Sequence, residues 1–475
     1  MNQSLLRLCP NVVLALTLLP FTALGDGPDS SISTKVDAYV RTEMERQHIP
    51  GLSLAVVRDG QVVYSNAYGL ADVELNVPVT QDTVFQIQSV TKTFTAAAIM
   101  MLVEEGKVAL DDPVAKYLDG TPDTWAKVTV RHLLNHTSGI KDFINEPTAS
   151  LRLDVSEQEV LEATAPRPLN FAPGERYAYS NTGYHLLAMI IRKVTGKSYG
   201  DFLAERFFQP LGMRHTRVQD LSKVIPGRAA GYRWRDDKLT NGDFVAQPIL
   251  SYGGGGILST AVDLAKWDAS LRKETLLRKS TLQQMWTPAT FNDGKKTKYG
   301  LGWGVNHFST HRYVQHTGGH VTGFQSVIRH YLDNGLTVIV LVNQSGAADP
   351  GKMAAQIARM YPALAPPDYK PIEDREPQVA ALLKDVYQQA SRGDLKQDAF
   401  DAAFWGELSQ HLTALRDFAA AAGPIESLAL VERRDEHGEH LYRYRLAMKG
   451  RAVIVLLVLG GDGKICNLEV EAPED

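Results

Sequence analysis

Two hairpin signals lying far apart in the chain constrain its fold more than any other feature. An Asp-Gly pair at 59–60 divides the β-type stretch 51–68, and this dipeptide between two such runs is a strong hairpin signal. An Asp-Asn-Gly triplet at 333–335 divides the stretch 323–343 in the same way. We therefore expect one antiparallel sheet built from both ends of a domain, with the residues between the hairpins inserted into it.

The sequence between the hairpins is largely helical. Apolar residues recur at helical spacing in 89–105 and 181–195, and a glycine suited to a helix C-terminus follows each stripe. Thr260 begins a further helix, with Asp263 three residues on as a variant of the capping box. Sheet and helices together predict an α/β (α+β) domain in which helices flank the sheet.

A chain of 475 residues is too long for one ordinary core, so we expect two domains. Three prolines in the nine residues 363–371 make a stiff, extended connector. We assign a first domain to 30–363, a linker to 364–375 and a C-terminal α+β domain to 376–475. The C-terminal domain should contain helices at 376–392 and 399–421, followed by four strands.

The first 25 residues have the features of a secretory signal peptide. Arg7 is their only charge, 12–19 is an uninterrupted apolar and Thr run, and 23–25 supplies small residues at a cleavage site before Asp26. A retained membrane anchor is the alternative, but the uncharged stretch falls short of the ~20 apolar residues of a span. We therefore expect a secreted or periplasmic protein with no stable membrane span after cleavage.

Charge and cysteine content narrow the function classes. The chain carries 50 basic and 54 acidic side chains, for a net charge of −4, without the concentrated basic face that nucleic-acid binding requires. Beyond residue 25 only Cys466 remains, so an internal disulfide is excluded and we expect a buried structural thiol. We expect a small-molecule ester, amide or peptide partner and no nucleic acid, while the oligomeric state is left open.

The strongest local motif is Ser89-Val90-Thr91-Lys92 at the start of a predicted helix. A serine hydroxyl needs a neighbouring base to become a good nucleophile, and a lysine three residues later lies one turn away on the same helix face. The motif alone is weak, because a capping serine followed by a solvated lysine gives the same pattern.

A second motif is Tyr179-Ser180-Asn181, also at a helix start. A phenol near a lysine ammonium can have its pKa lowered below about 10 and then serve as a base. Asn181 offers both a donor and an acceptor to a substrate amide. A helix cap beside a packing tyrosine is the alternative interpretation.

The third motif is His316-Thr317-Gly318-Gly319, just before the second hairpin. Glycines allow a substrate to lie against the backbone, and a free N–H there can complete an oxyanion hole. Alone, this segment is equally typical of a glycine-rich turn.

In order and spacing the three motifs resemble the Ser-x-x-Lys, Tyr/Ser-x-Asn and Lys-Thr-Gly set of penicillin-recognising serine enzymes. The surrounding sequence, from about residue 49 to residue 346, is similar to the class C β-lactamase-related serine hydrolase family. The segments that carry this resemblance are Phe85–Ala96, Leu110–Val114, Val130–Gly139, Phe171–Gly174 and Gly255–Ala261. The resemblance implies a β-lactamase/transpeptidase-like fold for the first domain.

The resemblance also implies roles for the motif residues. Ser89 would attack a carbonyl carbon and form an acyl-enzyme, while Lys92 and Tyr179 share its proton. Backbone N–H groups of Ser89 and Gly319 would hold the oxyanion, and Asn181 would contact the amide on the acyl side. No metal or organic cofactor is implied.

His316 stands where β-lactamases carry a lysine, and with Gly318 it belongs to the expected substrate-binding residues. Because a histidine is mostly neutral at pH 7, it suits a substrate carboxylate poorly. This favours the His-x-Gly branch, which includes esterases and D-aminopeptidases, over a β-lactamase or a D-Ala-D-Ala carboxypeptidase. A non-catalytic peptidoglycan-binding or sensory module is an alternative of another class.

Two further features invite a functional interpretation. His132 and His136 are four residues apart, but no carboxylate completes the pattern of a zinc hydrolase, so we expect a structural element and no metal site. Tyr252 and the glycines 253–256 are expected to shape the pocket wall, although a purely conformational role is equally compatible with the sequence.

Overall fold

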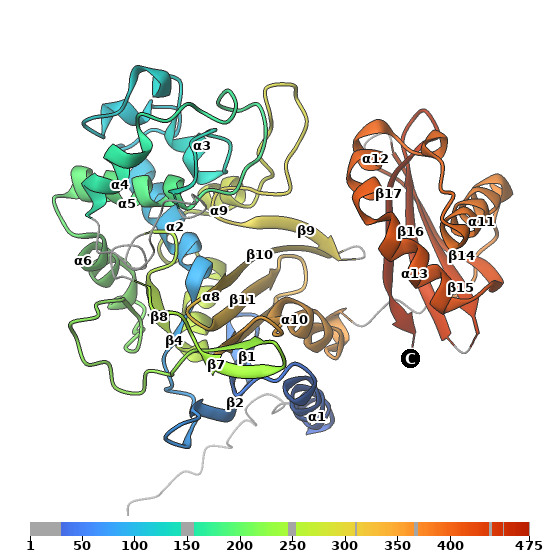
Figure 1. Ribbon diagram of the computed structural model, residues 1–475, viewed down its shortest axis with the longest axis horizontal. Helices are drawn as coiled ribbons and strands as arrows, with labels where there is room; N and C mark the ends of the chain where they lie inside the picture. The colour runs from blue at the N-terminus through green and yellow to red at the C-terminus, as the bar shows by residue number, and fades with distance from the viewer. Residues whose placement is uncertain are drawn as a thin grey trace, which may run out of the picture. The chain divides into compact units, whose positions relative to one another are not determined.

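The computed structural model describes residues 30–143, 156–245, 253–308, 311–364, 369–436, 439–449 and 451–474 (Figure 1). The chain divides into two compact units, of which one extends to Asn306 and resumes over His311–Ala363. The other comprises Leu364–Asp475 together with His307–Thr310. The predicted signal peptide lies outside the described residues. Within the described ranges, no helix combines the length and the apolar character that a membrane span needs.

The first unit is organised around a seven-stranded sheet in the order β3-β2-β1-β12-β11-β10-β9. Its strands are β1 (Gly51–Arg58), β2 (Gln61–Asp72), β3 (Val77–Pro78), β9 (Gly304–Phe308), β10 (His311–His320), β11 (Phe324–Tyr331) and β12 (Leu336–Val342). β1 pairs antiparallel with β12, with Leu52 opposite Val342 and Arg58 opposite Leu336. The predicted sheet built from both ends of a domain is therefore confirmed (Figure 1).

The turns of the two hairpins contact each other. Asp59 and Gly60 both have positive φ, at 50° and 76°, as a tight two-residue hairpin turn requires. The Asp59 N–H donates to the Gly335 carbonyl at 2.8 Å. Gly335 has a φ of 67°, and a Cβ on it would lie 2.0 Å from Asp59 Oδ1, so glycine is favoured where the turns meet.

Helices cover the sheet on both faces. β12 is buried throughout and β1 up to its last residue, as is typical of strands that read as continuous apolar runs. α8 (Ala261–Arg272) contacts β1, β2 and β12, and α10 (Pro350–Arg359) contacts β11 and β12. α8 begins after Thr260, whose hydroxyl accepts from the Asp263 N–H as predicted, but the capping box is not completed, because the Asp263 carboxylate accepts from His215, Thr216 and Lys266 instead.

A buried polar cluster ties α8 to this sheet. Asp268 of α8 accepts from His330 Nδ1 at 2.5 Å and from the Thr337 hydroxyl at 2.7 Å. Arg272 donates to both Asp268 and Thr337, at 3.1 and 2.7 Å. Although burial opposes it, the neighbouring His330 and Arg272 hold the pKa of Asp268 below its usual value, while burial lowers the pKa of His330.

The inserted residues supply the helices around the candidate site. α2 (Thr91–Glu104) follows a 3-10 turn, η1 (Gln88–Val90), and is buried continuously from Thr91 to Leu102. α5 (Asn181–Thr195) spans the residues predicted for it and ends at Gly196, whose φ is 69°. Among the described residues, the other helical segments of this unit are α1 (Ser30–Arg46), η2 (Val114–Lys116), η3 (Asp123–Trp125), α3 (Val130–Leu134), α4 (Glu157–Thr164), α6 (Tyr199–Leu203), η5 (Ala204–Phe208), α9 (Lys279–Met285) and η6 (Pro362–Leu364). Its short strands are β4 (Phe85–Gln86), β5 (Arg217–Val218), β6 (Tyr232–Arg235), β7 (Lys238–Asn241), β8 (Ile257–Ser259) and β13 (Gln344–Ser345).

The second unit places helices before a four-stranded antiparallel sheet in the order β14-β15-β16-β17. Its elements are α11 (Pro377–Arg392), η7 (Gln397–Ala399), α12 (Ala402–Leu408), η8 (Ser409–His411), α13 (Leu412–Ala422), β14 (Ile425–Glu436), β15 (Glu439–Met448), β16 (Arg451–Leu459) and β17 (Ile465–Glu474). The single helix predicted at 399–421 is wrong in detail. A 3-10 turn at Ser409–His411 divides it, because serine and histidine are weak helix formers.

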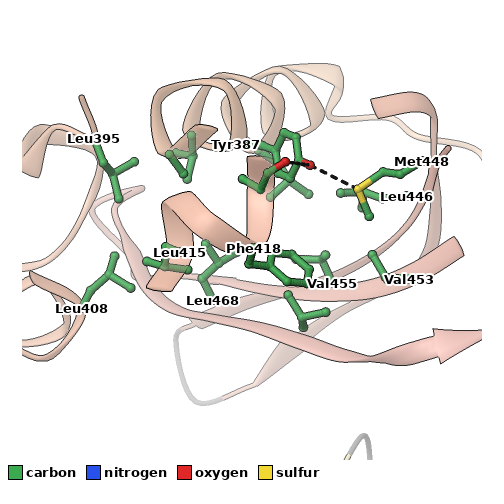
Figure 2. A pocket seen from close by; sticks show the side chains of 15 residues that line it. Tyr387, Leu395, Leu408, Leu415, Phe418, Leu446, Met448, Val453, Val455 and Leu468 are labelled. Carbon is green, nitrogen blue, oxygen red and sulfur yellow. Dashed lines mark hydrogen bonds between the residues drawn. The ribbon is translucent and has the colours of Figure 1, made fainter. Parts of the chain in front are cut away.

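Apolar side chains of the second unit surround a space of about 590 Å³, its open mouth included (Figure 2). Tyr387 lies at this space, but its hydroxyl is engaged by the Gly423 carbonyl at 2.6 Å and Met448 Sδ at 3.3 Å. Cys466, expected to be buried, is half-buried, and its Sγ donates to the Val458 carbonyl at 3.4 Å. Burial raises the pKa of the Cys466 thiol to about 11, which disfavours the reactive thiolate.

Candidate active site

Ser89 lies in an unusual turn between β4 and α2. The preceding residue, Gln88, has a φ of 49°, which is uncommon for a residue other than glycine. Its side chain donates to Gln86 Oε1 at 2.8 Å and to the Thr322 hydroxyl at 2.9 Å, and Thr322 in turn donates to Gln86. This closed, buried set of hydrogen bonds holds the backbone conformation that presents Ser89, which is half-buried.

β10 lies against this turn because Gly318 has no side chain. A Cβ on Gly318 would lie 2.4 Å from the Ile87 carbonyl oxygen and 2.5 Å from Ser326 Oγ. The Ser326 hydroxyl donates to the same Ile87 carbonyl at 2.7 Å and fixes β11 to the turn. Gly319 follows on β10 and is exposed, so its backbone borders the side of the turn that a substrate can reach.

Lys92 is fully buried one helical turn after Ser89. Its Nζ lies 3.2 Å from Ser89 Oγ, 3.0 Å from Asn181 Oδ1 and 2.7 Å from the carbonyl oxygen of Gly254. Burial lowers the pKa of Lys92 to about 7, although the negative charge of Asp142 acts in the opposite direction. A lysine with this pKa exchanges its proton at neutral pH, as a general base requires.

Tyr179 completes this group from the other side. Its ring lies over Lys92 Nζ, with 4.7 Å between the nitrogen and the ring centroid, and its hydroxyl is near enough to Ser89 for that side chain to influence the pKa of the phenol. Burial of the hydroxyl raises the pKa of the Tyr179 phenol, although the residue is 37% exposed, and the nearby Ser89 side chain only partly offsets this rise. The expectation that a lysine charge lowers this pKa is therefore wrong, because desolvation dominates and the phenol keeps its proton.

Asn181 is the first residue of α5, and its amide connects two charged groups. Its oxygen accepts from Lys92 Nζ, and its nitrogen donates to Asp142 Oδ2 at 3.0 Å. Ser180 is the N-cap of this helix, since its hydroxyl accepts from the Gly183 N–H. The Tyr179-Ser180-Asn181 motif thus combines a helix cap with two residues that contact Lys92.

His316 of β10 is buried beside Tyr299. Its Nε2 lies 2.9 Å from the Tyr299 hydroxyl and its Nδ1 lies 2.7 Å from the Thr317 carbonyl. Burial, followed by the charge of Lys92, lowers the pKa of His316 to about 3. His316 is therefore neutral throughout the physiological range, as the sequence led us to expect, and offers no cation to a substrate.

The two histidines considered as metal ligands have backbone partners instead. His132 Nδ1 accepts from the Thr129 N–H at 3.2 Å in a capping box at the start of α3. His136 Nδ1 accepts from the Ser180 N–H at 3.0 Å, and its ring packs 4.3 Å from that of Tyr179. Among the described residues, no group of three or more His, Cys, Asp or Glu side chains is arranged to hold a metal ion.

The glycine run supplies part of the site wall. A Cβ on Gly253 would lie 2.5 Å from the Tyr184 carbonyl oxygen, and Gly254 presents its own carbonyl to Lys92. The run therefore lies tightly against α2 and α5. Tyr252, predicted to belong to the same wall, lies outside the described residues.

The structure thus brings the motif residues into one site, drawn from the η1 turn, α2, α5 and β10. Sequence reasoning missed three contributors, namely Gln88, Asp142 and Tyr299. Gln88 stands next to the motif serine, and its position before a nucleophile turn was the available signal. Asp142 and Tyr299 lie outside every motif, so they become visible only once the chain is folded.

Comparison with known proteins places this geometry in a family. The beta-lactamase family model matches residues 36–360. Penicillin-binding protein 4* of Bacillus subtilis (strain 168) is 33% identical over 318 residues, which cover 63% of this chain and 69% of that protein. D-aminopeptidase of Brucella anthropi is 29% identical over 323 residues, 66% of this chain and 60% of that enzyme.

A solved structure agrees with these matches. D-amino acid amidase from Ochrobactrum anthropi SV3, complexed with D-phenylalanine, superposes with a TM-score of 0.58 at 27% identity, covering 70% of this chain and 99% of that one. The architecture is the beta-lactamase/transpeptidase-like fold, with antiparallel sheets flanked by helices. The chain belongs to the beta-lactamase family and is a serine hydrolase of that fold.

Proposed function

We propose that this enzyme hydrolyses amides, peptides or esters, with a D-amino-acid residue on the acyl side of the preferred substrates, through an acyl-enzyme on Ser89. The observation that carries the proposal is the contact of 3.2 Å between Lys92 Nζ and Ser89 Oγ, made by a lysine with a pKa of about 7. A buried amine that is neutral in half of the molecules at pH 7 can accept a serine proton directly.

In the acylation step, Ser89 Oγ forms a bond to the substrate carbonyl carbon as its proton passes to neutral Lys92. The two N–H bonds already on Lys92 are directed to Asn181 Oδ1 and the Gly254 carbonyl, so the nitrogen lone pair is left facing Ser89. Backbone N–H groups of Ser89 and Gly319 receive the oxyanion. Such donors contribute about 10²- to 10³-fold in rate.

The leaving group then departs with a proton. Tyr179 retains its phenolic proton and lies beside both Ser89 and Lys92, so it is placed to protonate the leaving nitrogen or oxygen and to be reprotonated by the Lys92 ammonium. Hydrolysis of the acyl-enzyme is the same sequence in reverse, with water in place of the leaving group. Each cycle consumes one water and restores both protons.

Neutral His316 supports the choice of substrate class. A carboxylate-bearing substrate, such as a penicillin or an acyl-D-Ala-D-Ala peptide, would meet no fixed cation at this position. Substrates with a free ammonium or an uncharged group there avoid the cost of burying an unpaired carboxylate. The relatives named D-aminopeptidase and D-amino acid amidase favour the same class.

We also propose that the enzyme acts outside the cytoplasm, after cleavage of residues 1–25. The support is the single charge, apolar run and small-residue site at the start of the sequence. The intact mass of the protein from a secreting host tests this, since cleavage leaves a chain beginning at Asp26. A chain that keeps its first 25 residues would contradict the cleavage and favour the retained membrane anchor.

The chemistry is tested by intact mass spectrometry after brief exposure to a fluorophosphonate, a penicillin and an activated short-chain ester, with Ser89→Ala as the control. We expect one fluorophosphonate adduct on the wild type and none on the variant. D- and L-alanine p-nitroanilide and diacetyl-lysyl-D-Ala-D-Ala are then compared as substrates. No adduct on the wild type would refute the hydrolase chemistry and favour a non-catalytic binding module, whereas rapid penicillin or D-Ala-D-Ala turnover would refute the substrate class.

A further inference from the structure

Asp142 follows the loop after α3, and its carboxylate lies across the first turn of α5. Oδ2 accepts from the Asn181 side-chain nitrogen at 3.0 Å, and Oδ1 accepts from the Thr182 backbone N–H at 3.3 Å. The Thr182 hydroxyl donates to the Lys141 carbonyl at 3.0 Å and also contacts Asp142 Oδ1 at 3.4 Å. The carboxylate is therefore fixed to both the backbone and the side chains of the helix N-terminus, where a negative charge is favourable.

An ionised carboxylate can only accept hydrogen bonds, whereas an asparagine amide has a donor end and an acceptor end. With Asp142 on one side, the nitrogen of Asn181 must face the carboxylate and its oxygen must face Lys92 Nζ. The opposite orientation would place oxygen against carboxylate and an NH₂ group against the lysine. Asp142 therefore determines that the oxygen of the Asn181 amide, and not its nitrogen, faces Lys92.

Charge acts together with this geometry. Within the described residues, the titratable or charged groups that face Lys92 are Tyr179, Tyr184, His136, His316 and Asp142. Burial lowers the pKa of both histidines and raises that of both tyrosines, so these four groups are uncharged at neutral pH. Asp142 is the anion among them and opposes the effect of burial on Lys92.

We propose that Asp142 is a positioning residue of the site, which turns the Asn181 oxygen toward Lys92 and keeps a negative charge close to that lysine. Through it, Lys92 keeps two directed acceptors when neutral, and the nearby negative charge opposes the lowering of the Lys92 pKa by burial. The effect of Asp142 on the reaction rate rests on the proposed acyl-serine chemistry, whereas its effect on the orientation of Asn181 and on Lys92 does not.

The decisive variant is Asp142→Asn, which keeps the shape of the side chain and removes its charge. Titration of Lys92 is followed by NMR of protein carrying ¹³Cε-labelled lysine, with the signal assigned through Lys92→Met. We expect Lys92 to titrate at lower pH in Asp142→Asn than in the wild type. The acid limb of the rate at which the fluorophosphonate modifies Ser89 should move to lower pH with it.

Asp142→Leu removes the acceptor as well as the charge, and above the acid limb we expect labelling of Ser89 to slow about 10- to 100-fold, the value of a hydrogen bond to a charged group. Thr182→Val is the matched control, because it removes a hydroxyl from Asp142 but keeps the Thr182 N–H and the Asn181–Asp142 contact. The control should lower the unfolding temperature without moving the Lys92 titration.

An unchanged Lys92 titration in Asp142→Asn would overturn the positioning role, as would wild-type labelling of Asp142→Leu. If the wild type itself is not labelled at Ser89, the proposed function fails. The NMR titration still decides the role of Asp142 in that case, so the two failures are distinguishable.

Discussion

Replacement of Gly318 by alanine should separate the strand beside Ser89 from the turn that carries the nucleophile. The added Cβ would lie 2.4 Å from the Ile87 carbonyl oxygen, 2.5 Å from Ser326 Oγ and 2.9 Å from Gln88 Cβ. Two of these atoms belong to the turn and the third to β11, so β10 must move away from both. The hydrogen bond between Ser326 and Ile87, at 2.7 Å, should be lost as the strand moves.

The magnitude follows from two separate effects. Overpacking a tightly filled position costs about 1–3 kcal/mol of unfolding free energy. Displacement of β10 also carries the Gly319 N–H away from the reacting carbonyl, and losing one oxyanion donor slows reaction about 10²- to 10³-fold. Gly318→Ala should therefore be modestly less stable and far slower to react with a fluorophosphonate at Ser89.

Gly319→Ala provides the adjacent control for stability. A Cβ on Gly319 would have its nearest neighbour, Gln325 Cγ, at 3.4 Å, which is an ordinary contact with a flexible side chain. Urea unfolding and the labelling rate are measured for both variants beside the wild type. The packing argument would be refuted if Gly318→Ala unfolds and is labelled like the wild type. It would also be refuted if Gly319→Ala is destabilised as strongly as Gly318→Ala.

Three further predictions follow from the buried charges. The rate of Ser89 labelling should rise with pH through a midpoint of about 7, because only neutral Lys92 accepts the proton, and a rate that is flat from about pH 5 to about pH 9 would contradict this. His316→Lys should raise the rate of penicillin acylation relative to cleavage of D-alanine p-nitroanilide, because it supplies a cation for the substrate carboxylate, and an unchanged ratio measured by mass spectrometry and absorbance would contradict it. Asp268→Asn should cost about 3–5 kcal/mol in urea unfolding, because Arg272 loses the anion that it meets at 3.1 Å, and a loss below about 1 kcal/mol would contradict this. The lowered pKa values of Asp268 and His330 both mean that the unfolded chain binds protons more readily, so wild-type stability should fall as the pH drops below about 6.5 and again below about 4, with the lower step smaller in the variant.

The sequence was informative for features of chemistry and backbone geometry that a few neighbouring residues determine. Asp-Gly at 59–60 specifies a hairpin by itself, and Gly196 terminates α5 where the pattern predicts, since both depend on positive φ. The three motifs predicted one site because their residue types are rarely combined in this order by chance. The fold then brought Ser89, Lys92 and Asn181 within hydrogen-bonding distance along one chain of contacts.

What the sequence could not supply depends on burial and on long-range contacts. The pKa of Tyr179 was expected to fall and is raised, because the cost of desolvating a phenolate is visible only in the folded surroundings. Asp142 lies 39 residues before Asn181 and outside every motif, so no local pattern pairs them. The partner of His316, Tyr299, is missed for the same reason, since a strand and a distant loop meet only in the fold.

Because β1 pairs with β12, the sheet of the first unit cannot close until the chain has been synthesised as far as β12. Ser89 leaves the ribosome early, but the strand that borders it, β10, and the strand that closes the sheet, β12, are both made near the end of the first unit. A chain stopped before residue 311 therefore carries Ser89 without β10, which borders the nucleophile, and without β12. Such fragments should be inert as hydrolases, and the unpaired edge of β1 should make them prone to aggregation. The chain should therefore become both reactive and soluble only after the closing strand has been made.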